Sequence, residues 1–455
     1  MTLLYALYFF ILIFSISSKP IKLAFKTRFN KNDLNKYDIM NILINNYIIT
    51  NISFGSNNQT FEMSIKLQND STFVLSDSCP QNIYAKKFKE NLSETYEVIK
   101  EKKRYFMYAF EYATLSKDSI VLYSEKEQNI KINDFKFMLA NTIWYDTLKD
   151  MSGTIGLILT NKDDDPQCTD FIKQLNGTID SEVFVLDYQD DYNGILYIGN
   201  YFHEFNEKYS ELDLIKMKAG NEKSQVKNWE INIDKIMINN KNNKNELIQN
   251  NTYLRLYYEI GVIAAPPIYH DYIIHNFFEK YLNSNICHEY LKFDEFSIFD
   301  KYKYIECSKS NFNKKLFPEL KFFNSESNIT FTLNYENLFY EFENKLYCLI
   351  IFPNYPIDVK YWYVGKPFFL KYKLFMDKDN KVIGLYEKEY KEKEESKSKF
   401  NVIYIVIIIL LIIVVIGILF YFLVIKKTRK KRANELEDNV DYTPYSEENN
   451  KENIN

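Results

Sequence analysis

Histidine and cysteine residues supply much of the catalytic chemistry of proteins, and their spacing in this sequence excludes several common sites. The four His residues include no HExxH motif, and His270 and His275 are too far apart to share one face of a helix. None of the five Cys residues lies in a local signature of a nucleophile. No glycine-rich loop is spaced to hold a phosphate group. We therefore expect no metal site and no cofactor.

The elements that would position a site are short strands. Stretches of alternating apolar and polar residues recur, for example YIITNISF from Tyr47, FEMSIKL from Phe61 and KVIGLY from Lys381. Long helical periodicity is scarce, and the exceptions are two short amphipathic stretches around Phe171 and Ile273. The pattern predicts an all-β protein with a few surface helices.

Composition limits the class of protein. The chain has 455 residues, of which 46% are hydrophobic and 17% aromatic, and this excludes a mainly disordered protein. The length is sufficient for two packed lobes. The formal net charge is only -4, and the central region has no basic face with interleaved aromatic residues, so we expect no nucleic-acid partner.

Apolar segments near both ends predict a membrane protein. Residues 1–18 have the length and small closing residues of a signal peptide, and an uncleaved anchor is the alternative interpretation. Residues 402–425 carry no charge and are long enough, as a helix, to cross a hydrocarbon core of about 30 Å. The basic cluster Lys426–Arg432 follows and predicts a cytoplasmic tail over residues 426–455. The solvated segment 391–401 is interpreted as a stalk. The protein is thus predicted to be a single-pass type I membrane protein of the secretory pathway, an endomembrane or the cell surface.

A lumenal or extracellular location agrees with two further features. Five cysteines in an oxidising compartment permit at most two disulfides. Seven Asn-x-Ser/Thr sequons are candidates for glycosylation, at Asn51, Asn58, Asn69, Asn91, Asn176, Asn250 and Asn328.

Several motifs occur in the order in which they occur in the pepsin-like aspartic peptidases. ISFGSNNQTF from Ile52 resembles the family's Gly-Thr-Pro-x-Gln-x-Phe approach to its first catalytic turn, and SGTIGLIL from Ser152 resembles its Asp-Gly-Ile-Leu-Gly-Leu segment. The segment WYVGKPFFLKYKLFMDKDNKVIGLYEK resembles the family's C-terminal ending, with matches at Trp362, Gly365, Phe368, Tyr372, Asp377 and Gly384.

The resemblance covers roughly residues 45–390. It implies two β-rich lobes related by a pseudo-two-fold axis, with a peptide-binding cleft between them. The expected organisation is a short N-terminal segment at 19–45, an N-lobe at 46–215 and a C-lobe at 216–390. The resemblance also implies a disulfide between Cys307 and Cys348, worth about 4 kcal/mol on the chain-entropy estimate. The pairing of the other cysteines, Cys79, Cys168 and Cys287, stays open.

Catalysis in this family depends on two Asp residues, one in an Asp-Thr/Ser-Gly turn of each lobe, which share a proton. Counting from the flanking motifs, the matching positions are Lys66 and Tyr257. A Lys amine offers donors and no acceptor, and an ordinary Tyr hydroxyl has a pKa near 10, so neither can replace the acids. The Thr and Gly positions of the turns are also changed, to Leu67, Gln68, Tyr258 and Glu259.

Two other positions bear on activity. A slipped alignment would make Asp70 and Glu259 the acidic pair. Phe106 matches the Tyr of the family's flap, where a phenyl ring keeps the packing on a bound chain and loses the hydroxyl donor.

The resemblance and the missing acids together predict a function. We expect a membrane-anchored homologue of the pepsin-like endopeptidases that is catalytically inactive and binds extended peptide or protein segments in its cleft. One alternative is an active aspartic endopeptidase with an unusual pair of acids. Another is an adhesion or scaffold glycoprotein that does not use the cleft.

Overall fold

The computed structural model describes residues 19–29, 38–69, 71–80, 85–103, 110–124, 129–143, 151–159, 170–220, 228–239, 245–293, 299–354, 360–386 and 425–427. The chain divides into one compact unit up to Glu389 and a second from Tyr390 onward. The predicted signal peptide, the stalk, and nearly all of the membrane helix and tail lie outside the described residues, as do Asp70, Phe106 and Cys168. No helix in the described ranges is long and apolar enough to cross a membrane.

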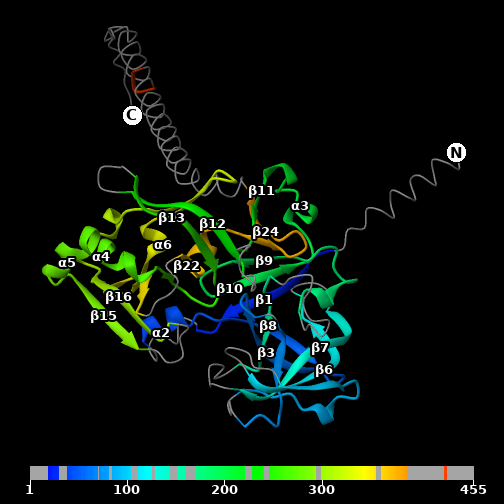
Figure 1. Ribbon diagram of the computed structural model, residues 1–455. Coiled ribbons are helices and arrows are strands. Elements are labelled where there is room, and N and C mark those ends of the chain that lie inside the picture. Colours follow the sequence, from blue (N-terminus) through cyan, green and yellow to red (C-terminus); the bar gives the residue numbers. More distant parts are fainter. Residues whose placement is uncertain are drawn as a thin grey trace, which may run out of the picture. The chain divides into compact units, whose positions relative to one another are not determined.

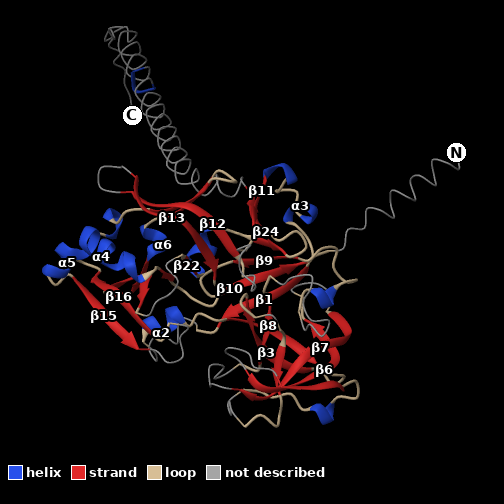
Figure 2. Cartoon of the chain, in the orientation of Figure 1, coloured by secondary structure: helices blue, strands red, loops and turns tan. Residues whose placement is uncertain are grey.

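The prediction of a mainly β protein is confirmed, because strands form about half of the described residues and helices a much smaller part (Figure 1, Figure 2). The described strands form one sheet of 13 and another of 11. In spatial order, the first sheet comprises β11 (Leu214–Lys218), β24 (Val382–Tyr386), β23 (Phe375–Asp377), β9 (Val183–Tyr188), β10 (Asn193–Ile198), β1 (Ile21–Thr27), β2 (Ile48–Phe54), β3 (Gln59–Lys66), β8 (Gly153–Gly156), β4 (Phe73–Leu75), β7 (Ile130–Ile143), β6 (Phe110–Leu122) and β5 (Glu97–Lys103).

The second sheet comes from the second half of the chain. In spatial order it comprises β18 (Ile329–Leu333), β17 (Leu320–Asn324), β12 (Glu230–Asn239), β13 (Asn245–Leu256), β22 (Tyr361–Val364), β14 (Ile263–Ala264), β21 (Ile350–Pro353), β16 (Lys301–Ser308), β20 (Lys345–Cys348) and β19 (Phe339–Phe342), with β15 (Cys287–Phe293) paired beside β16. The first sheet therefore contains strands from both ends of the described unit, whereas the second sheet does not.

Each sheet contains the same four-strand arrangement. In the first sheet the order is β3-β8-β4-β7, and in the second it is β13-β22-β14-β21. In both, the first pair is parallel, the middle pair antiparallel and the last pair parallel. In both, the chain leaves the first strand through a turn and enters the short third strand. These two turns are the ones that the sequence motifs flank.

Two glycines occupy matching places behind the turns. Gly156 pairs with Lys66 at the end of β3, and Gly365 follows the pair of Leu256 and Val364 at the end of β13. A Cβ added at Gly156 would lie 2.6 Å from the carbonyl oxygen of Asn69, and one added at Gly365 would lie 2.0 Å from that of Ile260. No side chain fits in either place, so a glycine is required for the strand to pass this close to the turn.

Alternating burial explains why the sequence forms β3. Phe61, Met63 and Ile65 are buried on one side of this strand, while Glu62 and Lys66 are only partly buried. Burial of every second residue is the pattern of a strand with one face on an apolar core. The alternation leaves Lys66 on the face opposite Ile65.

The predicted N-terminal segment 19–45 contains a strand and a short helix. The strand β1 pairs with β10 and β2. The helix α2 (Ile39–Ile44) begins at Asp38, whose carboxylate accepts a hydrogen bond from the backbone N–H of Met40 at 2.8 Å. Most residues of α2 are buried, and they share one apolar cluster with Ile260, Val262 and Ala264 of the second sheet's turn region.

Other helices are short and lie at the ends of strands (Figure 2). The prediction of a helix around Ile273 is confirmed, because α4 (His270–Ile273), a π-helical stretch (Ile274–Phe278) and α5 (Glu279–Asn283) follow one another there. Around Phe171, where a helix was also predicted, the structure has a single 3-10 turn, Lys173–Leu175. The remaining helices are α3 (Phe202–Phe205), α6 (Tyr335–Leu338) and α7 (Lys366–Lys371).

The predicted disulfide between Cys307 and Cys348 is wrong, since Cys307 is bonded to Cys287. The two bonded residues lie directly opposite each other on the antiparallel strands β15 and β16, with their Cα atoms 4.0 Å apart. On its other side Cys307 faces Leu346 of β20, so Cys348 is two residues out of register with it. Cys348 is buried as a free thiol, and burial raises its pKa to about 12.

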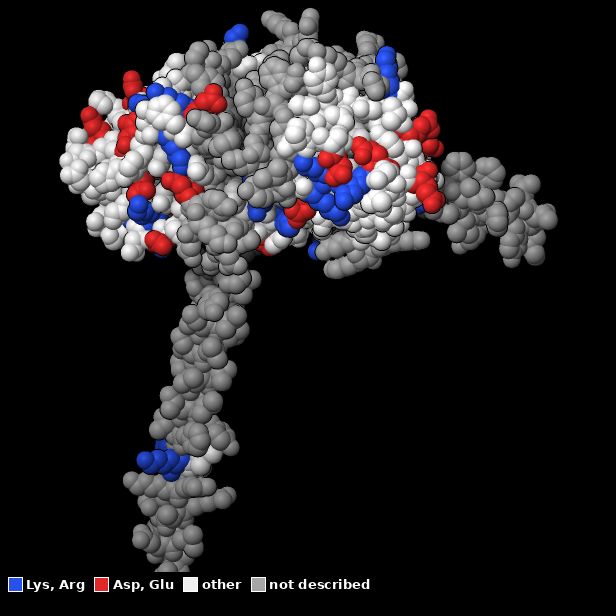
Figure 3. Space-filling view, turned by 90° about the horizontal axis from the view of Figure 1, so that it is seen from below, with Lys and Arg blue, Asp and Glu red and all other residues white. Residues whose placement is uncertain are grey.

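Charged residues of both signs are interspersed on the face shown in Figure 3. Several charged residues in the described part of the chain form exposed ion pairs, such as Lys26 with Glu62 at 2.7 Å.

Candidate functional site

The candidate site consists of the turns that end β3 and β13. The carbonyl of Lys66 accepts a hydrogen bond from the backbone N–H of Leu157 at 2.9 Å, just after β8. The backbone N–H of Tyr257 donates to the carbonyl of Val364 at 2.9 Å, at the end of β22. Together with the matching glycines, these bonds place Lys66 and Tyr257 at equivalent points of the repeated arrangement.

The two turns meet through an ion pair. Nζ of Lys66 lies 3.6 Å from Oε2 of Glu259, which is two residues beyond Tyr257. The carboxylate is the buried partner, with 5% of its side chain exposed, while 20% of the Lys66 side chain is exposed. Burial raises the pKa of Glu259 above its usual value, although Lys66 acts in the opposite direction. Oε1 of Glu259 has no hydrogen-bond partner among the described residues.

Aromatic rings lie beside Lys66 and beside Tyr257. Nζ of Lys66 lies 5.5 Å from the centre of the Tyr47 ring, within the range of a cation–π contact. The Tyr257 ring lies 6.0 Å from that of Tyr363. Burial, and next the charge of Glu259, raise the pKa of Tyr257 well above 10. Its hydroxyl therefore stays protonated and can act as a hydrogen-bond donor.

The neighbouring turn residues pack in the core or form a hydrogen bond between the two turns. Nε2 of Gln68 donates to the carbonyl of Leu256 at 3.0 Å, which ties the first turn to the end of β13. Leu67 is fully buried. Tyr258 is also fully buried, with its ring 3.8 Å from that of Phe369, and burial raises its pKa. Leu67 and Tyr258, which directly follow Lys66 and Tyr257, therefore pack in the core and supply no small hydroxyl group.

A proton-sharing pair of acids needs two carboxylates in contact. In the described part of the chain, the shift in the pKa of Glu259 comes from burial and Lys66 alone, with no contribution from a second acid. The alternative partner Asp70 and the predicted flap position Phe106 lie outside the described residues. Lys66 and Tyr257 can therefore donate hydrogen bonds here, and Glu259 is the described carboxylate that lies beside Lys66.

A second Lys residue lies beside the second turn, and its surroundings were not foreseen in the sequence. The backbone N–H of Lys366 donates to the carbonyl of Ile260 at 2.8 Å, and its amine donates to the carbonyl of Asp191. Its Nζ also lies 5.5 Å from the centre of the Tyr192 ring. Burial lowers the pKa of Lys366.

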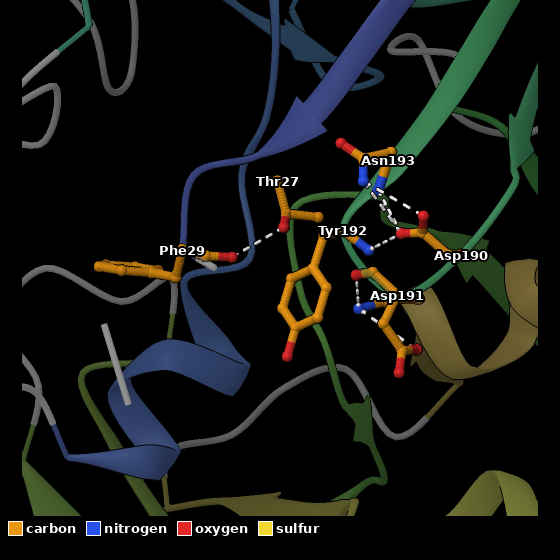
Figure 4. A network of polar contacts seen from close by, with 7 residues as sticks. Thr27, Phe29, Asp190, Asp191, Tyr192 and Asn193 are labelled. Atoms are coloured by element: carbon orange, nitrogen blue, oxygen red, sulfur yellow. Dashed lines mark hydrogen bonds and ion pairs between the residues drawn. The ribbon is translucent and has the colours of Figure 1, made fainter. Parts of the chain in front are cut away.

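Figure 4 shows the hairpin that receives the amine of Lys366. The carboxylate of Asp190 accepts from the backbone N–H of Tyr192 at 2.6 Å and from that of Asn193 at 2.9 Å. The backbone N–H of Thr27, at the end of β1, donates to the carbonyl of Tyr192 at 2.6 Å. The hairpin thus connects Lys366 to the N-terminal segment.

Tyr47 is a further residue that sequence reasoning missed. It follows α2, and its carbonyl accepts a hydrogen bond from the backbone N–H of Arg28 at 2.7 Å. The carbonyl of Leu43 in α2 accepts from the backbone N–H of Gly261 at 2.6 Å, so the N-terminal segment lies against the second turn. The only signal in the sequence was the apolar composition of residues 39–44.

The other predicted positions are spread over the surface or show no metal geometry. Among the sequon residues, Asn69 is partly buried and six are exposed, namely Asn51, Asn58, Asn91, Asn176, Asn250 and Asn328. Within the described ranges, no three or more His, Cys, Asp or Glu side chains are arranged to hold a metal ion.

No protein-family model matches the chain, and no curated protein matches its sequence. The resemblance to pepsin-like peptidases is therefore carried by the sequence motifs alone.

Proposed function

We propose that residues 46–390 form the two lobes of a pepsin-like domain that has lost peptidase activity and keeps its cleft for binding extended peptide or protein segments. Residues 402–425 anchor this domain in a membrane as a transmembrane helix, with the domain on the lumenal or outer side. The duplicated order β3-β8-β4-β7 and β13-β22-β14-β21 supports two related lobes. A fold by itself does not define an activity, so we infer the function from the residues of the two turns.

The observation that carries the proposal is the ion pair of Lys66 with Glu259 at 3.6 Å. Peptide hydrolysis by this family needs one ionised and one protonated carboxyl group around a single water molecule. Here an amine occupies the position of the first acid and a phenol that of the second. In the described part of the chain, the one carboxylate in contact with Lys66 is that of Glu259, which is paired with this amine rather than with a second acid.

Proteolysis assays test the loss of activity. The full chain is purified in detergent and incubated with unfolded protein substrates between about pH 3 and pH 7, the range in which paired carboxyl groups act. An active pepsin-like peptidase in the same detergent is the positive control. We expect no cleavage that pepstatin inhibits. Pepstatin-sensitive cleavage that disappears in both Asp70→Ala and Glu259→Ala would establish the alternative of an active enzyme with an unusual pair.

Peptide capture tests the retained binding. Peptides recovered from the full chain are compared with those recovered from Gln68→Trp, which adds bulk at the junction of the two turns. We expect the wild-type chain to enrich a set of extended peptides and the variant to lose it. Equal recovery from both proteins would favour the adhesion or scaffold alternative, in which this region plays no part.

A further inference from the structure

The ion pair leaves hydrogen-bond donors available at the candidate site. Of the two partners, Lys66 is the more exposed, and Glu259 lies buried beside it. A Lys amine has three N–H groups, and at 3.6 Å its contact with Glu259 is an ion pair longer than an ordinary hydrogen bond. No described residue hydrogen-bonds to the hydroxyl of Tyr257, which lies close enough to Glu259 for the charge to act on it. The amine of Lys66 and the hydroxyl of Tyr257, both hydrogen-bond donors, thus occupy the positions at which the pepsin-like family has carboxylate acceptors.

The charged and titratable neighbours limit what this site can bind. The Tyr47 ring, on the N-terminal segment, lies 5.5 Å from Nζ of Lys66, and the Tyr363 ring, on β22, lies 6.0 Å from that of Tyr257. Arg255 on β13 is engaged by Glu230, with the guanidinium nitrogen 2.6 Å from the carboxylate. Within the described residues, Glu259 is therefore the one acid that compensates the charge of Lys66.

We propose that Lys66 and Tyr257 recognise a carboxylate of an extended peptide, so that the cleft selects acidic segments. This inference rests on the proposed function, because it assigns a ligand chemistry to the same cleft. A carboxylate accepts hydrogen bonds from an amine and a phenol at once, and a charge-assisted bond is about twice as strong as a neutral one. A neutral amide of the same shape would gain much less from Lys66.

Binding of a carboxylate is coupled to the protonation of Glu259. With Glu259 ionised, the pair is neutral, and a ligand carboxylate would add an uncompensated negative charge to a partly buried site. With Glu259 protonated, the ligand replaces it as the partner of Lys66, and the site stays neutral. The ligand therefore raises the pKa of Glu259 by taking over its amine, and complexes of acidic peptides take up a proton. Their affinity increases as the pH falls, down to the range near 4 in which the ligand carboxylate itself is protonated.

The test uses two pools of fluorescent decapeptides of random sequence, with either Glu or Gln fixed at the centre and the C-terminus amidated. Binding to the full chain in detergent is measured by fluorescence anisotropy at about pH 5 and about pH 7.5. Both values lie above the ordinary pKa of a Glu side chain, and they lie on either side of the ordinary pKa of a His side chain. We expect the Glu pool to bind about tenfold more tightly than the Gln pool at the lower pH, as for a hydrogen bond to a charged group. The preference should decrease at the higher pH. A third pool, with central Gln and a free C-terminal carboxylate, distinguishes a terminal carboxylate from a side-chain carboxylate.

Three variants assign the effect to the site. Lys66→Met should abolish the preference for the Glu pool over the Gln pool. Glu259→Gln should keep the preference at both pH values, because the competing charge is gone. Lys26→Met removes an exposed amine of the same sheet. It should leave the preference for the Glu pool, and its dependence on pH, as in the wild-type chain. Thermal unfolding of each variant verifies that it is folded.

The outcomes separate this inference from the proposed function. Equal binding of the Glu and Gln pools at the lower pH, or a preference that survives in Lys66→Met, would overturn carboxylate recognition and leave peptide binding intact. Absence of binding by every pool at both pH values would overturn both.

Discussion

The indole of Trp229 and the carbonyl of Leu157 join the two copies of the repeated strand arrangement. Nε1–H of Trp229 donates to this carbonyl at 2.7 Å, and both residues are buried. Leu157 follows β8 in the first sheet, while the carbonyl of Trp229 accepts from the backbone N–H of Leu256 at the end of β13. One side chain thus connects the backbones behind the two turns of the candidate site.

Trp229→Phe should lower the free energy of unfolding by about 1–3 kcal/mol, because the Leu157 carbonyl would stay buried without its donor. Urea denaturation of the full chain measures this. Trp362→Phe is the matched control: Trp362 donates to the side chain of Gln249 at 2.7 Å, and this partly buried side chain can turn to water. If Trp229→Phe lowers the free energy of unfolding no more than Trp362→Phe does, the proposed role of the Trp229 hydrogen bond is contradicted.

Glu259 should make stability depend on pH in a direction opposite to that of most acids. Since the pKa of Glu259 is raised in the folded state, the folded chain holds a proton that the unfolded chain releases above its usual pKa of 4.5. The free energy of unfolding should therefore fall as the pH rises from about 4.5 through the raised pKa, by about 1.4 kcal/mol for each unit by which folding raises it.

Glu259→Gln should remove this decrease, and Glu62→Gln, at an exposed site, should not. Urea denaturation of the three proteins at a series of pH values makes the comparison. A wild-type chain that gains stability relative to Glu259→Gln as the pH rises would show that Lys66 outweighs burial at this carboxylate.

Peptide mapping without reduction should recover Cys287 linked to Cys307 and Cys348 as a free thiol. Because burial raises the pKa of Cys348 to about 12, iodoacetamide should label it only after the chain unfolds. The double variant Cys287→Ala and Cys307→Ala should lose about 3 kcal/mol of unfolding free energy, the chain-entropy estimate for a loop of this length. Cys348→Ala keeps the disulfide and is the control. A peptide linking Cys307 to Cys348 would contradict the pairing on β15 and β16.

Local patterns predicted the elements of this fold, because burial of alternate residues is a property of a single strand. The alternation from Phe61 onward predicted β3, and the helical stretch around Ile273 was predicted from its amphipathic spacing. The helix α2 is different, since six residues are too few for a stable isolated helix. It is stabilised by its contacts with Ile260 and Val262, which lie far along the chain.

The contacts of the candidate site could not be predicted from local patterns. Counting between motifs assigned Lys66 and Tyr257 to matching turns, but the partner of Lys66 depends on how the two sheets meet. The same holds for the disulfide. Cys307 has neighbours on both sides of β16, and only the registers with β15 and β20 decide which cysteine faces it.

The position of β23 and β24 has a consequence for the synthesis of the protein. These strands are formed by residues 375–386, yet they complete the first sheet by pairing with β9 and β11. A nascent chain must therefore expose the unfinished edges of that sheet until its last strands leave the ribosome. Long-range pairing of this kind folds slowly and leaves unpaired edges open to aggregation. Chains truncated before residue 375 should depend on chaperones rather than fold as shorter, independent units.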